Sequence, residues 1–200
     1  MPKIDPDNTY VVSDNHFFHS RSLEFVNEET GVKMRPWAPG QVEEMNEHMV
    51  RQWNSVVSPD SLVLHCGDVF FTKDGWKILD RLNGKKELIM GNHDDKAMEH
   101  YTRYFRRLHG SYTVRSRTGN HDLILTHIPV HPSQFFRFFG NVHGHIHDTL
   151  ILGVDGKPDP RYLNVCVEQI NYTPITLREC IRRIEENRDK AGYHEVSVGR

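Results

Sequence analysis

The feature that most constrains this chain is a repeated pairing of a short apolar run with a polar residue just behind it. Asp14 follows Thr9–Ser13, Asp68 follows Leu62–Cys66, Asn92 follows Glu87–Met90, and His127 follows Leu123–Thr126. Such short runs, rich in β-branched residues, predict buried strands. In α/β sheets, ligands gather at the carboxyl ends of the strands. We therefore expect these polar residues to meet at one edge of a sheet.

The remaining patterns predict the other elements of an α/β fold. Two more strands are predicted at Tyr112–Arg115 and Tyr162–Val167, and helices at Pro39–Val57, Trp76–Leu82, Asp94–Leu108 and Thr176–Lys190. The clearest helix has one apolar stripe, formed by Val42, Met45, Met49, Trp53 and Val56. Strands alternate with helices first and dominate later, which predicts a layered, mixed α/β sandwich. A length of 200 residues fits a single domain over residues 1–200.

Composition narrows the classes of protein to consider. The net charge of -2 gives no general attraction to nucleic acid or anionic membranes, so we expect no stable nucleic-acid binding. No apolar stretch reaches the roughly 18 residues of a transmembrane helix, and the start of the chain does not resemble a signal peptide. Three cysteines, Cys66, Cys166 and Cys180, are odd in number and far apart. This pattern favours a reducing compartment, and we expect a cytoplasmic protein.

Histidine is over-represented, with 14 residues, and it is the commonest metal ligand in proteins. Histidines gather in Asp14-Asn15-His16, in Gly91-Asn92-His93-Asp94 and in His143-Gly144-His145-Ile146-His147. If the last segment is extended, its three histidines point the same way. Each cluster alone also has an ordinary explanation, such as a capped turn, a helix N-cap or adventitious metal binding. Their combination favours a metal site.

In chain order these clusters read Asp-x-His, Gly-Asp, Gly-Asn-His-Asp, His and Gly-His-x-His, over roughly residues 9–172. This series resembles the calcineurin-like metallophosphoesterase superfamily, in particular its small members without a large cap domain. The resemblance implies a four-layer α-β-β-α sandwich of two mixed sheets flanked by helices. Asn15 stands where threonine is usual, and Phe18 stands where some relatives have glycine. Neither difference removes a ligand.

The resemblance also implies a ligand set for two divalent cations. The first cation takes Asp14, His16 and His147, the second takes Asn92, His127 and His145, and Asp68 bridges them. His93 is the implied catalytic imidazole, and Asp94 is expected to hold it by a hydrogen bond. His143 matches no ligand position. His19 lies near the first cation site, and we consider it for substrate contact together with Asn92 and His93.

The segment Phe135–Phe139, which includes Arg137, has two possible roles. It can form a lid in which the phenylalanines stack on a nucleobase and Arg137 meets a phosphate. Alternatively it is a short amphipathic helix packed on the core, with Arg137 in solvent, and this second role is favoured. Arg35, Asn54 and Arg115 are weaker candidates for substrate contact.

These inferences predict a phosphoesterase that cleaves a phosphodiester or phosphomonoester by direct attack of a hydroxide shared by two metal ions. The mixed histidine, aspartate and asparagine ligands suit Mn²⁺ first, and also Fe²⁺, Zn²⁺ or Ni²⁺. The expected substrate is a small-molecule or nucleotide phosphoester. A nucleotide pyrophosphohydrolase and a non-catalytic metal-binding scaffold remain as alternatives. A nuclease is disfavoured because the chain shows no additional domain or broad basic groove.

Overall fold

The computed structural model describes residues 4–28, 30–72, 74–95, 98–115 and 122–193, and it contains two mixed β-sheets. The first sheet has the order β4-β3-β2-β1-β9, formed by Phe105–His109, Lys85–Ile89, Leu62–His65, Thr9–Val12 and Ile175–Thr176. The second has the order β5-β6-β7-β8, formed by Tyr112–Val114, Leu123–Leu125, Gly140–His143 and Tyr162–Asn164. Only β9 and β5 run antiparallel to their neighbours.

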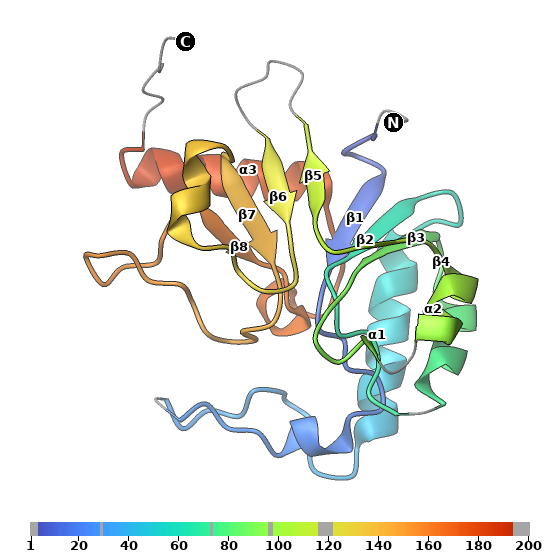
Figure 1. The fold of residues 1–200 in the computed structure, drawn as a ribbon. Helices are drawn as coiled ribbons and strands as arrows, with labels where there is room; N and C mark the ends of the chain where they lie inside the picture. The colour runs from blue at the N-terminus through green and yellow to red at the C-terminus, as the bar shows by residue number, and fades with distance from the viewer. Residues whose placement is uncertain (1–3, 29, 73, 96–97, 116–121, 194–200) are drawn as a thin grey trace.

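Helices cover the outer faces of the two sheets (Figure 1). The helices α1 (Val42–Val56) and α2 (Met98–Tyr104) lie against the first sheet, and α3 (Leu177–Lys190) lies behind the second. This arrangement confirms the four-layer α-β-β-α sandwich. Short 3₁₀ helices lie in the connections between these elements: η1 (Ser20–Leu23), η2 (Gly75–Arg81), η4 (Pro132–Phe136) and η5 (Val167–Ile170). Among the described residues, no helix has both the length and the apolarity needed to span a bilayer.

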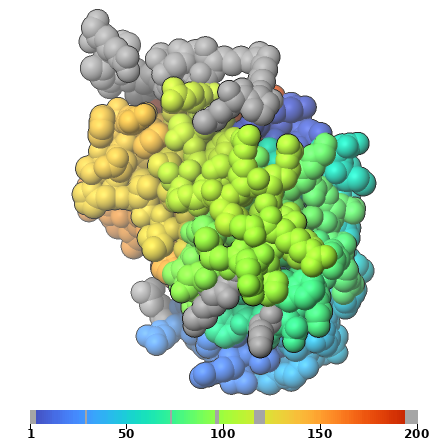
Figure 2. All heavy atoms as spheres, turned by 45° about the vertical axis from the view of Figure 1, so that its right-hand side comes forward, coloured from blue at the N-terminus to red at the C-terminus, as the bar shows by residue number. Residues whose placement is uncertain are grey.

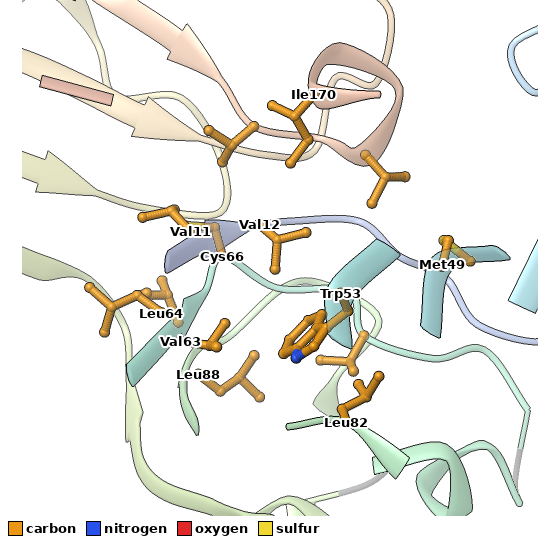
Figure 3. Packing of buried hydrophobic residues seen from close by; sticks show 14 of the residues in the cluster. Val11, Val12, Met49, Trp53, Val63, Leu64, Cys66, Leu82, Leu88 and Ile170 are labelled. Carbon is orange, nitrogen blue, oxygen red and sulfur yellow. The ribbon is translucent and has the colours of Figure 1, made fainter. Parts of the chain in front are cut away.

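The core forms because the predicted apolar stripe of α1 packs on the first sheet. Trp53 is 1% exposed and lies close to Val63, Leu82 and Leu88 (Figure 3). Its indole N–H donates to the carbonyl of Asn83 at 2.9 Å, which satisfies its polar atom inside the core. Burying side chains of this size contributes roughly 1.5–3 kcal/mol each, so the α1–sheet contact fixes the strands that carry the site.

The two sheets join along the chain between β4 and β5, which are separated only by Gly110 and Ser111. Seen from the side that carries β4, yellow-green atoms of about residues 98–115 fill the centre of the face (Figure 2). The sheets meet again at the carboxyl end of β1. There the N–H of Ser13 donates to the carbonyl of Val165 at 2.9 Å, and the N–H of Val167 donates to the carbonyl of Ser13 at 3.1 Å. This seam brings residues that follow β1 next to residues that follow β8.

Most predicted helices and strands are present, although their first and last residues differ from the prediction. One predicted helix is wrong over part of its length. Within Asp94–Leu108, of which residues 96 and 97 lie outside the described residues, the α-helix is α2, and the chain then turns directly into β4. The spacing of Tyr101, Phe105 and Leu108 suits a helix, yet parallel pairing of β4 with β3 extends the sheet and satisfies the backbone there instead. Trp76–Leu82 is the 3₁₀ helix η2, and the short strands β7 and β9 were not predicted.

Candidate metal centre

The seven residues predicted as cation ligands come together at the carboxyl ends of the strands, near the seam between the sheets. Asp14 and His16 follow β1, Asp68 follows β2, Asn92 follows β3, His127 follows β6, and His145 and His147 follow β7. In each of two subsets of these residues, the donor atoms lie within 4.8 Å of one another. The subsets are Asp14 with His16 and His147, and Asp14 with Asp68 and His127. The described residues therefore contain candidate groups of metal ligands at the predicted place.

The first candidate cation site is built around Asp14 Oδ1. This oxygen lies 3.6 Å from His16 Nε2 and 3.9 Å from His147 Nε2. It is buried and, within the described part of the chain, has no hydrogen-bond partner. The other oxygen, Oδ2, accepts hydrogen bonds from the Ser13 hydroxyl at 2.5 Å and the His145 N–H at 2.8 Å. A buried carboxylate oxygen without a partner is costly, and a cation at this position would satisfy it.

Asp68 occupies the position between the two candidate sites. Its Oδ2 lies 3.6 Å from His16 Nε2 on one side and 3.5 Å from His127 Nε2 on the other. Its Oδ1 instead accepts a hydrogen bond from the backbone N–H of His93 at 3.0 Å. One oxygen is thus held by the backbone, and the other faces both histidines, which is the arrangement that a bridging carboxylate needs.

The second candidate site is defined by the tautomer of His127. Its Nδ1 lies 2.8 Å from the carbonyl of Cys66, which can only accept, so Nδ1 carries the proton. In the neutral ring Nε2 then carries a lone pair, and it faces Asn92 Oδ1 at 2.8 Å and His145 Nδ1 at 3.1 Å. His127 Nε2 and Asn92 Oδ1 are both electron-rich, and two such atoms at 2.8 Å repel one another unless a cation lies between them. This donor set therefore fits a divalent metal ion.

Glu168, which was not predicted to act at the site, orients His147 together with Arg35. Its Nδ1 lies 3.3 Å from both carboxylate oxygens of Glu168, which in turn accepts a hydrogen bond from Arg35 Nε at 2.8 Å. Burial lowers the pKa of His147, but the hydrogen bond and charge of Glu168 outweigh burial and raise it. A carboxylate behind a ligating imidazole fixes its tautomer and increases its basicity. Glu168 carries no sequence signal that points to this role.

Arg35 is fully buried, which rules out the substrate contact suggested for it. Its guanidinium donates to the carbonyls of Asp14 at 2.8 Å and of Asn15 at 3.0 Å, besides the Glu168 carboxylate. Arg35 thus ties the loop after β1 to η5. Five N–H donors in a fixed planar fork suit arginine, rather than lysine, to this clamp.

A third group with metal-ligand spacing contains His147, Cys166 and Glu168. Two of its members already have other partners. The Cys166 thiol donates to Asp14 Oδ2 at 3.2 Å, and burial raises its pKa well above its usual value, so it stays protonated. Glu168 is paired with Arg35. We therefore assign these two residues to the support of Asp14 and His147.

The expected hydrogen bond between Asp94 and the His93 imidazole is replaced by other contacts. Asp94 is buried and accepts from the N–H groups of Asp68 at 2.8 Å, Gly91 at 2.8 Å and Val69 at 3.2 Å, and from the Tyr101 hydroxyl at 2.5 Å. These four bonds use the acceptor capacity of a carboxylate. Asp94 is therefore a positioning residue for the loops after β2 and β3, and not a catalytic partner of His93.

Three of the residues expected to contact substrate, Asn92, His93 and His19, lie beside the candidate centre. Asn92 and His93 are exposed beside the ligands, and the His93 ring lies 5.6 Å from that of His16. His19 also packs against His16, with ring centroids 5.6 Å apart, and burial lowers its pKa to about 4. Both histidines are thus close to the candidate centre, as expected. Asn54, a weaker candidate for substrate contact, donates a side-chain hydrogen bond to the carbonyl of Arg81, in the region where α1 meets η2.

Arg137 and the segment Phe135–Phe139 lie at the other end of the second sheet. The N–H of Phe139 donates to the carbonyl of Asp122, before β6, whereas His127 follows that strand. Phe135 packs on Tyr162 at the start of β8 with centroids 4.9 Å apart. Asp122 and His127 are five residues apart, which at 3.3 Å per residue is roughly 17 Å. This position speaks against the substrate contact predicted for Arg137 and favours the alternative, in which Phe138 and Phe139 pack on the core and Arg137 is exposed.

The loop after β7 is not extended, contrary to expectation. His145 and His147 have φ values of 73° and 48°, and Ile146 donates its N–H to the carbonyl of Gly144 at 2.9 Å. His143 instead points into the core, where its Nδ1 lies 2.9 Å from the Gly144 carbonyl. A Cβ at Gly144 would stand 2.0 Å from Ser13 Oγ and 2.2 Å from Asp14 Oδ2. Only glycine allows this approach of the two sheets.

Comparison with known proteins identifies relatives over most of the chain. The chain is 30% identical to "Uncharacterized protein MJ1445" of Methanocaldococcus jannaschii over 185 residues, covering 90% of this chain and 92% of that protein. It is also 30% identical to the Gene 66 protein of Mycobacterium phage L5 over 177 residues, covering 72% of this chain and 80% of the phage protein. No family model matches.

Among solved structures, the "Protein of Unknown Function AQ665" from Aquifex aeolicus shares the fold. It matches with a TM-score of 0.63 and 21% identity, covering 87% of this chain and 97% of that one. A novel archaeal phosphodiesterase matches only at a TM-score of 0.42, with 18% identity over 78% of this chain and 81% of that one, a value too low to carry an argument.

Family membership follows from the sequence relatives, and the position of the motifs in the fold agrees with the resemblance described above. All five motifs lie at strand ends of a two-sheet sandwich and converge on one centre. The chain belongs to the family of MJ1445 and the phage Gene 66 protein.

Proposed function

We propose that this protein is a metal-dependent phosphoesterase that holds two divalent cations and hydrolyses a phosphodiester or phosphomonoester. The observation that carries the proposal is the crowding of possible ligand atoms around His127 Nε2, which faces Asn92 Oδ1, His145 Nδ1 and Asp68 Oδ2 at 2.8, 3.1 and 3.5 Å. Asp14, His16 and His147 would hold one cation, and Asn92, His127 and His145 the other. Asp68 would bridge them. Nitrogen-rich ligands of this kind favour Mn²⁺, Fe²⁺, Zn²⁺ or Ni²⁺ over Mg²⁺ alone.

When bound, the cation pair supplies charge to offset that of the phosphoryl oxygens and lowers the pKa of a coordinated water. The chain's own residues supply the remaining chemistry. His93 is exposed at the rim, and its backbone N–H is fixed by Asp68 Oδ1. From this position its imidazole can donate a proton to the leaving oxygen, a contribution worth about 10²–10⁴ in rate. The thiols of Cys66, Cys166 and Cys180 are buried, so none of them is placed to act as a nucleophile.

The first test combines metal content with turnover. We expect the protein purified with Mn²⁺ to contain two ions per chain and to hydrolyse bis-p-nitrophenyl phosphate, p-nitrophenyl phosphate or a dinucleoside polyphosphate. Replacing the bridging residue, Asp68→Ala, should lower metal content below two per chain and abolish most turnover. Two ions retained in the variant would contradict the bridging role. A metal-loaded protein that turns over none of these substrates would instead favour the scaffold alternative.

The second test separates chemistry from metal binding. His93→Ala should keep two ions per chain, because His93 is not among the proposed ligands, and should lower kcat about 10²–10⁴-fold. Metal analysis and steady-state kinetics on the same sample measure both. His100→Ala is a matched control, since His100 stacks on Trp76 with centroids 5.1 Å apart, away from the centre. Wild-type kcat in the His93 variant would remove His93 from the mechanism.

A further inference from the structure

Four aromatic rings form a continuous wall beside the first candidate cation site. This aromatic wall consists of Phe25, His19, Phe71 and His93, in order of contact. Ring centroids are 5.6 Å apart for Phe25 and His19, 3.8 Å for His19 and Phe71, and 5.5 Å for Phe71 and His93. His19 and Phe71 stack face to face, with an interplanar angle of only 9°. The facing sides of this pair cover each other, so the wall offers a ligand ring their outer faces and edges.

The wall begins directly at a proposed cation ligand. The His16 ring lies 5.6 Å from His19, 6.3 Å from Phe71 and 5.6 Å from His93. Since His16 Nε2 faces Asp14 and Asp68, a phosphoryl group bound at the centre would lie within a short reach of the wall. His93, the proposed proton donor to the leaving oxygen, is itself part of the wall. The alcohol that leaves would therefore depart along these rings.

The two phenylalanines of the wall are exposed, in contrast to Phe17 and Phe70 nearby in the chain. Phe25 is 41% and Phe71 is 45% exposed, whereas Phe17 and Phe70, which pair in an isolated bridge, are 0% and 4% exposed. Burying a phenylalanine fully contributes roughly 1.5–3 kcal/mol, so the exposure of both rings leaves part of this stabilisation unused. Single exposed apolar residues are common, but a stacked group in contact with a ligand residue indicates a binding surface.

We propose that the aromatic wall is a substrate subsite that stacks a nucleobase, so that the substrate is a nucleotide-type phosphoester whose phosphoryl group lies at the cation pair. This proposal rests on the proposed phosphoesterase function and adds the substrate class. Bases offer flat π-faces to aromatic side chains, and stacking contributes about 1–3 kcal/mol per base with little dependence on base identity. The wall therefore predicts a preference for nucleotides over phosphoesters of aliphatic alcohols, with weak discrimination among bases.

The test compares two ligands that differ by the base alone. Isothermal titration of the Mn²⁺-loaded protein with AMP and with ribose 5-phosphate gives the two dissociation constants, with phosphate release followed in parallel to subtract any turnover. We expect AMP to bind about 5–150-fold more tightly, the ratio that corresponds to one stacked base. Phe71→Leu should reduce this ratio to near one. Phe136→Leu is the matched control, because Phe136 is 86% exposed on η4, away from the centre, and it should keep the wild-type ratio.

Each other outcome has a definite meaning. Equal affinities for AMP and ribose 5-phosphate in the wild-type protein, or an unchanged ratio in Phe71→Leu, would overturn the subsite. Phenyl phosphate bound as tightly as AMP would show that any aryl group suffices and would overturn the nucleobase assignment. In these cases hydrolysis of bis-p-nitrophenyl phosphate would leave the phosphoesterase proposal intact. Failure of that hydrolysis, and of inorganic phosphate to bind the metal-loaded protein, would instead remove the proposed function.

Discussion

At the scale of single residues, the centre is held by backbone conformations that residues other than glycine rarely adopt. Five proposed ligands have positive φ values: Asp14 at 57°, His16 at 46°, Asp68 at 57°, His145 at 73° and His147 at 48°. Each such residue costs on the order of 1–3 kcal/mol and persists only where its surroundings enforce it. Hydrogen bonds from the N–H of Asp14 to the Gly67 carbonyl and from the N–H of His16 to the Asp68 carbonyl enforce two of them. The ligand directions are thus fixed by the chain.

His65 is buried and is not a proposed ligand, and because of it we expect the free energy of unfolding to fall in mild acid. His65 Nδ1 accepts the N–H of Gly67 at 3.1 Å, and its Nε2 donates to Asn15 Oδ1 at 2.8 Å, so protonation would place a proton against Gly67. Burial lowers the pKa of His65 from 6.5 to about 4. The unfolded chain therefore binds more protons between these values, and stability falls as the pH is lowered from 6.5 to 4. The expected loss is about 3 kcal/mol, at 1.36 kcal/mol per pKa unit.

Urea unfolding of the metal-free protein at several pH values between 7 and 4 measures this loss. The variant His65→Gln keeps one acceptor and one donor but does not titrate, so its stability should depend less steeply on pH in the same window. Identical slopes for the two proteins would show that His65 is not the group responsible.

At the scale of elements, the first cation site depends on a contact between two irregular segments. η5 carries Glu168, and the loop before α1 carries Arg35, whose side chains are 5% and 0% exposed. Through this pair the loop after β1 and the loop after β7 are tied together, since Arg35 holds the Asp14 carbonyl and Glu168 holds His147. Removing one member of a buried ion pair is strongly destabilising, because the other charge is then left buried without a partner. The pair therefore couples local structure to metal binding.

Glu168→Gln tests this coupling while it keeps an oxygen for the Arg35 guanidinium. Without the negative charge behind His147, we expect one of the two Mn²⁺ binding steps to weaken about 10–100-fold, the usual effect of removing such a partner. The other step, which uses Asn92, His127 and His145, should change little. Isothermal titration of the metal-free protein measures both steps. Glu179→Gln, on α3 away from the centre, is the control, and equal affinities in both variants would contradict the role of Glu168.

At the scale of the whole molecule, the centre lies where two sheets meet, so the cations should hold them together. Its donors come from the ends of β1, β2 and β3 in the first sheet and of β6 and β7 in the second. Because the unfolded chain does not preserve this arrangement, bound metal stabilises only the folded state.

Chelation should therefore lower the melting temperature. At a free metal concentration 100 times the dissociation constant, each site contributes about 2.7 kcal/mol, which corresponds to roughly 5–10 °C for a chain of this size. Calorimetry with Mn²⁺ and with EDTA measures the difference. Asp68→Ala should show a much smaller difference because both sites lose their shared ligand. A wild-type melting temperature unaffected by EDTA would contradict a metal centre across the seam.

The sequence alone determined the parts that depend on local patterns. The apolar runs predicted most strands, the stripe from Val42 to Val56 predicted α1, and the polar residues behind the runs predicted a site at strand ends. These features follow from side-chain periodicity and from the geometry of parallel strands, which act over a few residues. The histidine-rich clusters added the expected ligand types.

Only the tertiary structure decided which partner each polar group takes. Asp94 bonds the loop after β2 and not His93, Arg35 is buried against Glu168, Arg137 lies at the far end of β6, and Phe105 joins a strand. Residues Arg35 and Glu168 are 133 positions apart, and no local pattern encodes such a contact. Side chains that are ambiguous in sequence are assigned when the fold buries them, because a buried polar group must find its partner wherever the packed chain supplies one.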